Sequence, residues 1–184
     1  MGGPTHAAVR MERDMSYLIR LKSYFENLSR DLDKVTQGVC IVLILLMTIE
    51  VLTAVFFRYV LNAPIKWGEE LARLIMVWAG LLGISIALKN GEHIGLEMLT
   101  SQLSGRPLYL VRLIVNLMIF VFLLVLFIWG VEICREAWAS FMPGLQISWT
   151  WSHLAIPVTA AIQLVHIFAW LIEQTIGIFR TEQA

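Results

Sequence analysis

Four long apolar segments limit how this chain can fold. Each reaches or approaches about 20 residues, the length of helix that crosses a hydrocarbon core roughly 30 Å thick. Hydrophobic residues make up 58% of the 184 residues, which is more than the roughly 45–50% typical of soluble domains. The sequence therefore predicts an all-α membrane protein with four transmembrane helices, at residues 35–57, 71–88, 108–131 and 154–172.

The orientation of these spans follows from the distribution of positive charge. The connections are short, so neighbouring spans are expected to be antiparallel, and the 14 lysines and arginines then divide ten against four between the two sides. The positive-inside rule assigns the richer side, and both termini with it, to the cytoplasm. The formal net charge is zero, which provides no general basic field for binding nucleic acid.

The segments outside the four spans have different compositions. Residues 1–14 lack the apolar core of a signal peptide, and we expect them to form a disordered leader. Over residues 15–34, apolar side chains recur three and four positions apart, which predicts an amphipathic helix on the cytoplasmic membrane surface. The same spacing also permits packing on a partner helix or in a short coiled coil. Residues 173–184 are expected to form a cytoplasmic tail.

The turn between the first two spans carries charged and aromatic residues that are costly to place in lipid. Residues three and four apart share a helix face, so two glutamates here are candidate partners for one arginine. The residues of this turn are Arg58, Tyr59, Trp67, Glu69, Glu70 and Arg73.

Small residues recur every four positions along the second span, at Ala79, Gly83 and Ala87. Such spacing lets another helix approach closely in a membrane, where lipid supplies no hydrophobic drive between helices. We expect this face to meet protein.

One acidic residue, Glu50, lies inside the first span. It precedes Arg58 by eight residues and therefore lies about 10 Å or more below the outer end of the helix. Arg73 lies near the same depth on the antiparallel second span. Because an intramembrane charge costs at least about 2.5 kcal/mol, we predict an ion pair between Glu50 and Arg73. Glu69 and Glu70 are competing partners for Arg73, and a proton or cation site at Glu50 is the functional alternative.

Aromatic residues cluster in the last outer loop, around a Pro143-Gly144 turn. An interfacial aromatic belt accounts for them without a special role. An external surface that docks another protein is the alternative.

The histidines suggest one competing function. A b-type haem needs two axial ligands at matching depth on facing helices, and both His93 and His166 are expected near the inner surface. The chain would then be a haem- or quinone-associated anchor of a membrane oxidoreductase.

Motifs typical of enzymes are missing from the sequence. It contains no nucleotide-binding, zinc-protease or serine-hydrolase motif and no close pair of carboxylates. These absences favour an accessory membrane subunit that is not an enzyme, with no catalytic residue, no cofactor and no metal site.

Several motifs resemble those of one family, the small membrane subunit of tripartite ATP-independent periplasmic (TRAP) transporters, of the DctQ type. The resemblance extends from about residue 34 to residue 172 and excludes the chain before residue 15. Its motifs are Phe57-Arg58-Tyr59, Trp67-Gly68-Glu69-Glu70-Leu71-Ala72-Arg73, Val77-Trp78, Gly91-Glu92-His93-Ile94, Pro143-x-Leu145-x-Ile147 and Ala155-Ile156-Pro157-Val158.

This resemblance implies a multi-pass subunit of the bacterial inner membrane, within a sodium-coupled importer of organic acids such as dicarboxylates or sialic acid. Its partners would be membrane lipid, a large elevator-type membrane subunit of the DctM type and a periplasmic binding protein of the DctP type. The small subunit would brace the large one and help to dock the binding protein, for which Trp149 and Trp151 are candidate contacts. Interaction roles are implied for Arg58, Tyr59, Trp67, Glu69, Glu70, Arg73 and His93, whereas Glu50 lies outside the family motif.

Overall fold

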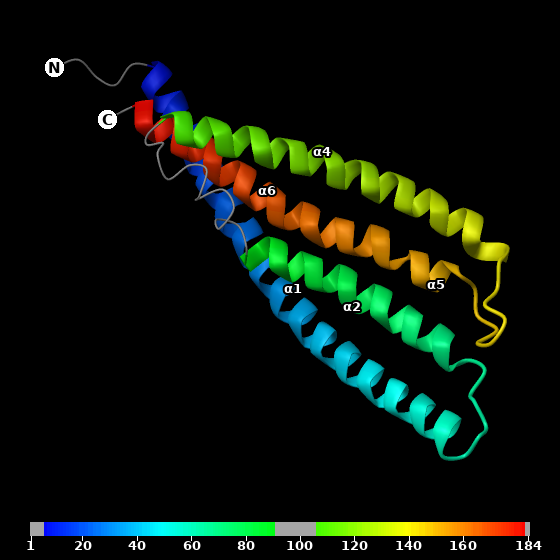
Figure 1. The fold of residues 1–184 in the computed structure, drawn as a ribbon. Helices are drawn as coiled ribbons and strands as arrows, with labels where there is room; N and C mark the ends of the chain where they lie inside the picture. The colour runs from blue at the N-terminus through cyan, green and yellow to red at the C-terminus, as the bar shows by residue number, and fades with distance from the viewer. Residues whose placement is uncertain (1–5, 91–105, 183–184) are drawn as a thin grey trace.

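The computed structural model describes residues 6–90 and 106–182, which form a bundle of long helices (Figure 1). The elements in chain order are α1 (His6–Tyr59), α2 (Gly68–Asn90), α4 (Arg106–Glu136), the 3-10 helix η1 (Ala137–Ala139), α5 (Thr150–His153) and α6 (Ala155–Glu182). Over the described ranges, four helical segments are long and apolar enough to span a membrane. The predicted all-α membrane fold with four spans is confirmed.

The two ends of the bundle differ in what they carry. The beginning of α1 and the end of α6 lie together at one end, which we call the terminal end (Figure 1). The opposite end, called the loop end, carries the turn between α1 and α2 and the loop between η1 and α5 (Figure 1).

Helix α6 is the central helix of the bundle. Each membrane-spanning segment contains an apolar stretch of 18 residues. In the segment of α5 and α6, 56% of this stretch is buried, whereas the values for the segments of α1, α2 and α4 are 6%, 17% and 11%. Helix α4 packs along one side of α6, and α2 and part of α1 pack along the other (Figure 1). Leu123 of α4 meets Ile167 and Trp170 of α6 in the buried core. The outer faces of the other three helices are therefore left for lipid or for another membrane protein.

Helix α1 differs from the expected division into a leader, a surface helix and a span. It runs without a break for 54 residues from His6, so the expected disordered leader is already helical there. At 1.5 Å per residue, 54 residues extend for about 81 Å, far more than the roughly 30 Å hydrocarbon core. The polarity of the sequence changes near residue 35, but no proline interrupts the helix. A change of polarity alone does not end a helix.

The apolar stripe of residues 15–34 packs in part on the middle of α6. The rings of Phe25 and Phe168 contact edge to face, with centroids 4.8 Å apart, and Leu28 and Leu32 are half-buried. Part of the stripe is thus covered by a helix of the same chain. Helix α6 continues to Glu182 and so occupies most of the expected tail.

A hydrogen-bonded cluster joins α1, α2 and α6 near the terminal end. The Lys89 ammonium donates to Ser29 Oγ at 2.6 Å, and Ser29 Oγ lies 2.7 Å from His166 Nδ1. Because an ammonium can only donate, Ser29 accepts from Lys89. Its hydroxyl donates to or accepts from the imidazole nitrogen according to the histidine tautomer. Ser29 and His166 are only 0% and 1% exposed. We call these three residues the terminal-end clasp.

The clasp predicts unequal costs for removing two serine hydroxyls from α1. In Ser29→Ala, Lys89 and His166 lose their shared partner, and each buried unsatisfied group costs about 1–3 kcal/mol. In the control Ser23→Ala, the lost hydroxyl bonds only the exposed Arg20 carbonyl, and the change should stay within about 0.5 kcal/mol. Thermal unfolding of the purified protein in detergent should give a lower midpoint for Ser29→Ala alone. Equal midpoints for the two variants would contradict the clasp.

Candidate functional site

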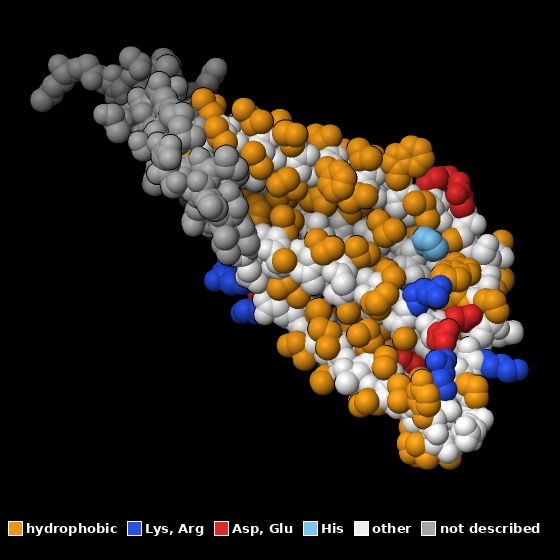
Figure 2. Space-filling view, in the orientation of Figure 1, with side chains coloured by type: hydrophobic (Ala, Val, Ile, Leu, Met, Phe, Trp, Pro, Cys, Tyr) orange, Lys and Arg blue, Asp and Glu red, His pale blue; other side chains and the backbone are white. Residues whose placement is uncertain are grey.

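Charged side chains gather at the loop end of the bundle. Figure 2 shows blue and red side chains concentrated there, while hydrophobic side chains cover the middle of the same face. The turn that connects α1 to α2 contributes most of the residues singled out from the sequence. This turn lies directly against the loop before α5, because a Cβ added to Gly144 would come within 2.9 Å of the Lys66 carbonyl oxygen.

Glu70 connects the two loops. Its carboxylate oxygens accept from the backbone N–H of Gly144 at 2.9 and 3.0 Å and from the N–H of Leu145 at 2.8 Å. Such charge-assisted hydrogen bonds are roughly twice as strong as neutral ones. Glycine is required for this approach, because a Cβ at residue 144 would also lie 3.0 Å from Trp67 Cα. We call Glu70, Gly144 and Leu145 the loop-end clasp.

The fold of the loop presents these two N–H groups to Glu70. Met142 N donates to the Ile147 carbonyl at 2.8 Å, and Gln146 N donates to the Met142 carbonyl at 2.9 Å. Gln146 adopts a φ of 59°, in the left-handed region that few non-glycine residues occupy. The loop therefore closes on itself and leaves the amides of residues 144 and 145 for the carboxylate.

The other residues of the α1–α2 turn lie at the surface. Arg58 pairs with Glu69 at 2.8 Å, and their side chains are 54% and 75% exposed. An ion pair this exposed contributes at most about 1 kcal/mol. Tyr59 and Trp67 are 73% and 43% exposed.

The predicted ion pair between Glu50 and Arg73 is not formed. Glu50 Oε1 lies 3.0 Å from the position of a Cβ on Gly68, and its buried Oε2 has no hydrogen-bond partner in the part of the chain that the structure describes. Arg73 is exposed, and Glu69 and Glu70 bind elsewhere. Glu50 thus meets the start of α2 at Gly68, whereas Arg73 lies five residues further along α2 and on a different face of that helix. The sequence pattern does not give the rotation of a helix about its axis.

The small-residue face of α2 is open over much of its length. The Ala79 carbonyl accepts from Cys40 Sγ at 3.6 Å, so this position packs on α1. By contrast, a Cβ added at Gly80 or Gly83 would meet nothing within 4 Å, and Ala87 is exposed. We call Arg73, Gly80, Gly83 and Ala87, which are spaced seven, three and four residues apart, the open face of α2.

The two tryptophans proposed for docking have different surroundings. Trp78 Nε1 donates to the Trp151 carbonyl at 2.9 Å and thereby ties α2 to α5, while the Trp151 side chain is 57% exposed. Trp149 is half-buried, and its ring lies edge to face against His153. In the segment from η1 to α5, the exposed aromatic surface therefore consists of Trp151 with Trp138 and Phe141, which are 71% and 63% exposed.

Comparison with known proteins decides between the candidate functions. A model of the family described as "Tripartite ATP-independent periplasmic transporters, DctQ component" matches residues 47–177. The chain belongs to the DctQ family. This family is a transport component and not a family of enzymes, and the matched range contains the loop-end clasp and the open face of α2.

Two relatives show how much of this chain, and of each relative, is similar in sequence. The sialic acid TRAP transporter permease protein SiaT of Haemophilus influenzae (strain 86-028NP) is 32% identical over 124 residues, which are 67% of this chain and 20% of SiaT. The sialic acid TRAP transporter small permease protein SiaQ of Vibrio cholerae is 27% identical over 101 residues, which are 55% of this chain and 58% of SiaQ. The similarity thus spans a fifth of SiaT and less than three fifths of SiaQ.

The haem hypothesis has little support in this DctQ protein. His166 takes part in the terminal-end clasp, and His93 lies outside the described residues. Within the ranges that the structure describes, no group of three or more His, Cys, Asp or Glu side chains is placed to hold a metal ion.

The hydrogen bond of His166 to Ser29, and that of Lys89 to Ser29, were not predicted from the sequence. The available signal was a polar residue on each of three helices at the same depth.

Neutralising Glu70 should loosen the loop-end clasp. The variant Glu70→Gln replaces one charged acceptor oxygen by an NH₂ group, so the amides of Gly144 and Leu145 lose charge-assisted bonds. Their hydrogen exchange should become roughly tenfold faster, which corresponds to about 1.4 kcal/mol of local stability. The same substitution in the neighbouring residue, Glu69→Gln, removes only an exposed pair and should leave these amides unchanged. Unchanged exchange in Glu70→Gln would show that the carboxylate does not hold the loop.

Proposed function

We propose that this chain is the small membrane subunit of a sodium-coupled TRAP importer of organic acids in the bacterial inner membrane, where it braces a large permease subunit of the DctM type. Membership of the DctQ family supports this role. Two relatives carry the names of sialic acid transporters, which favours sialic acid or a similar carboxylate as the solute of the whole importer.

The observation that carries the bracing role is the open face of α2. Arg73 lies five residues beyond the start of α2 at Gly68, or about 7.5 Å along the axis. A charged side chain within a span is expensive in lipid, and glycines without a neighbour leave space for a second helix. Lipid tails make no favourable polar contact with the arginine and no close packing that requires glycine. A partner helix with an acidic or polar side chain can bind the arginine and pack closely on the glycines.

The two clasps suit a stationary part of the importer. The loop-end clasp joins the α1–α2 turn to the loop before α5, and the terminal-end clasp joins α1, α2 and α6. The four spans are thereby connected at the loop end, and α1, α2 and α6 are also joined near the terminal end. A subunit held in this way resists deformation while the large subunit moves solute through an elevator motion beside it.

We assign the terminal end to the cytoplasm and the loop end to the periplasm, because the terminal side carries most of the lysines and arginines. The exposed aromatic surface of Trp138, Phe141 and Trp151 then faces the periplasm. Large exposed aromatic side chains are typical of protein contacts, so this surface is suited to help dock a binding protein of the DctP type. The competing role, a haem or quinone anchor, is not favoured.

Two substitutions on the open face test the bracing role. Gly83→Leu should leave the chain folded, because nothing lies within 4 Å of an added Cβ, but should keep the partner helix away. Arg73→Ala should remove an interhelical polar contact. Each should lower copurification with the large subunit by roughly tenfold, the effect of about 1.4 kcal/mol.

The matched control is Gly38→Leu, since an added Cβ at Gly38 of α1 also meets nothing within 4 Å. Copurification of Gly38→Leu should equal that of the unchanged protein. Full copurification of both open-face variants would show that the large subunit does not bind this face.

A further inference from the structure

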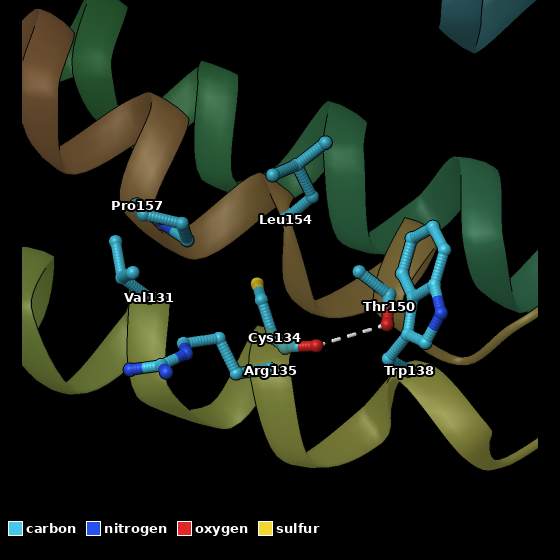
Figure 3. Close-up of a pocket in the computed structure, with 7 residues that line it drawn as sticks. All are labelled: Val131, Cys134, Arg135, Trp138, Thr150, Leu154 and Pro157. Atoms are coloured by element: carbon cyan, nitrogen blue, oxygen red, sulfur yellow. Dashed lines mark hydrogen bonds between the residues drawn. The ribbon is translucent and has the colours of Figure 1, made fainter.

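A groove lies between α4 and the segment formed by α5 and the start of α6, at the loop end (Figure 3). Its volume is about 450 Å³, within the range of sites that hold small molecules. One wall consists of Val131, Cys134 and Arg135 of α4 together with Trp138 of η1. The other wall consists of Thr150, Leu154 and Pro157.

The groove lies on the loop-end side of a close contact between α4 and α6, which pack together along much of their length. At the contact, a Cβ on Gly130 would lie 3.0 Å from both Ile156 Cγ2 and Pro157 Cδ, so glycine permits the close approach. One turn further, the Thr150 hydroxyl donates to the Cys134 carbonyl at 3.0 Å (Figure 3). The hydroxyl is thus already satisfied, and the walls that remain are apolar. A water molecule finds few hydrogen-bond partners in such a space, whereas a hydrocarbon chain needs none.

The rim of the groove carries both signs of charge. Arg135 is 75% exposed on the last turn of α4, and its Nη1 lies 3.2 Å from Glu132 Oε2. A guanidinium has five N–H donors, so Arg135 keeps donors for an additional anion. Glu136, the next residue, is also exposed. One cation between two carboxylates complements a headgroup that itself carries a phosphate and an ammonium.

Trp138 lies at the mouth of the groove and is 71% exposed. Tryptophan favours the level of the lipid headgroups, because its ring is apolar and its N–H is polar. Val131 lies two turns deeper and is 40% exposed, so the groove opens sideways along the span. Trp138 at the mouth and the apolar wall below it are therefore arranged in the order of the headgroup level and the acyl chain of a lipid, and the Arg135 guanidinium lies beside that wall on the Val131 side (Figure 3).

We propose that this groove is a binding site for one phospholipid with a primary ammonium in its headgroup, phosphatidylethanolamine. An acyl chain lies between Val131 and Leu154, the phosphate accepts from the Arg135 guanidinium, and the ammonium donates to Glu132 or Glu136. A quaternary ammonium cannot donate, and a glycerol headgroup has no cation for the carboxylates. The site shares no residue with the open face of α2, so a lipid here does not compete with a partner at that face.

The test uses the full chain copurified with its large subunit and native mass spectrometry in detergent. Equal amounts of phosphatidylethanolamine, phosphatidylcholine and phosphatidylglycerol of identical acyl chains are added. Phosphatidylethanolamine should be retained roughly tenfold better than either of the others, the effect of one charge-assisted hydrogen bond.

Val131→Trp should fill the groove and abolish this preference. Val121→Trp, at an exposed position of the same helix, should leave it unchanged. Arg135→Gln should reduce retention of all three lipids by roughly tenfold, because each carries the phosphate.

Three results would overturn the proposal: equal retention of the three lipids, a preference that survives in Val131→Trp, or cross-linking of a photoreactive side chain at residue 131 to the large subunit instead of to lipid. The last result would identify the groove as a protein interface. Failure of the lipid site would leave the proposed bracing role intact, because that role is tested at the open face of α2.

Discussion

Buried polar groups that find their partners only across helices hold this bundle together. In lipid, helices gain little from the hydrophobic effect between them, so packing and interhelical hydrogen bonds decide the arrangement. The structure places one such set at each end. Glu70 binds two backbone amides of a distant loop, and Ser29 lies between Lys89 and His166. The apolar surfaces between these ends select the membrane as surroundings, but they do not fix which helix faces which.

The same constraint explains why the functional surfaces lie outside the packed interior. Most of the apolar stretch of α6 is buried, whereas most of the apolar residues of α1, α2 and α4 lie at the surface of the bundle. On α2 this outward surface includes an arginine and two glycines without neighbours, which suits a protein partner. Between α4 and α6 it includes an apolar groove with charges at the rim, which suits a lipid. A small membrane subunit that braces a larger one needs both kinds of surface, because it is in contact with protein on one side and with the bilayer on the other.

The sequence predicted the features that depend on periodicity and local motif. The four spans and the DctQ family were both correct, since long apolar runs and the motif around Glu69, Glu70 and Arg73 are local signals.

The features that depend on rotation and long-range contact were not predictable in this way. Glu50 lies against Gly68, five residues before Arg73 on α2, and Glu50 Oε2 is left without a partner among the residues described. The continuity of α1 over His6–Tyr59 is also not predictable in this way, because a change from polar to apolar residues marks entry into the membrane but does not show whether the helix ends. The partner of His166 is Ser29, which lies 137 residues away along the chain. Lys89 of α2 donates to the same Ser29, and no local pattern indicates this cluster.

As proposed above, this chain is a stationary subunit of a transporter, and the chain does not carry solute by itself. The most direct measurement is uptake of labelled sialic acid or dicarboxylate into vesicles under an inward sodium gradient, with the chain reconstituted alone and with its large subunit and binding protein. The account predicts uptake only when all three proteins are present. Sustained sodium-dependent uptake by the chain alone would contradict it.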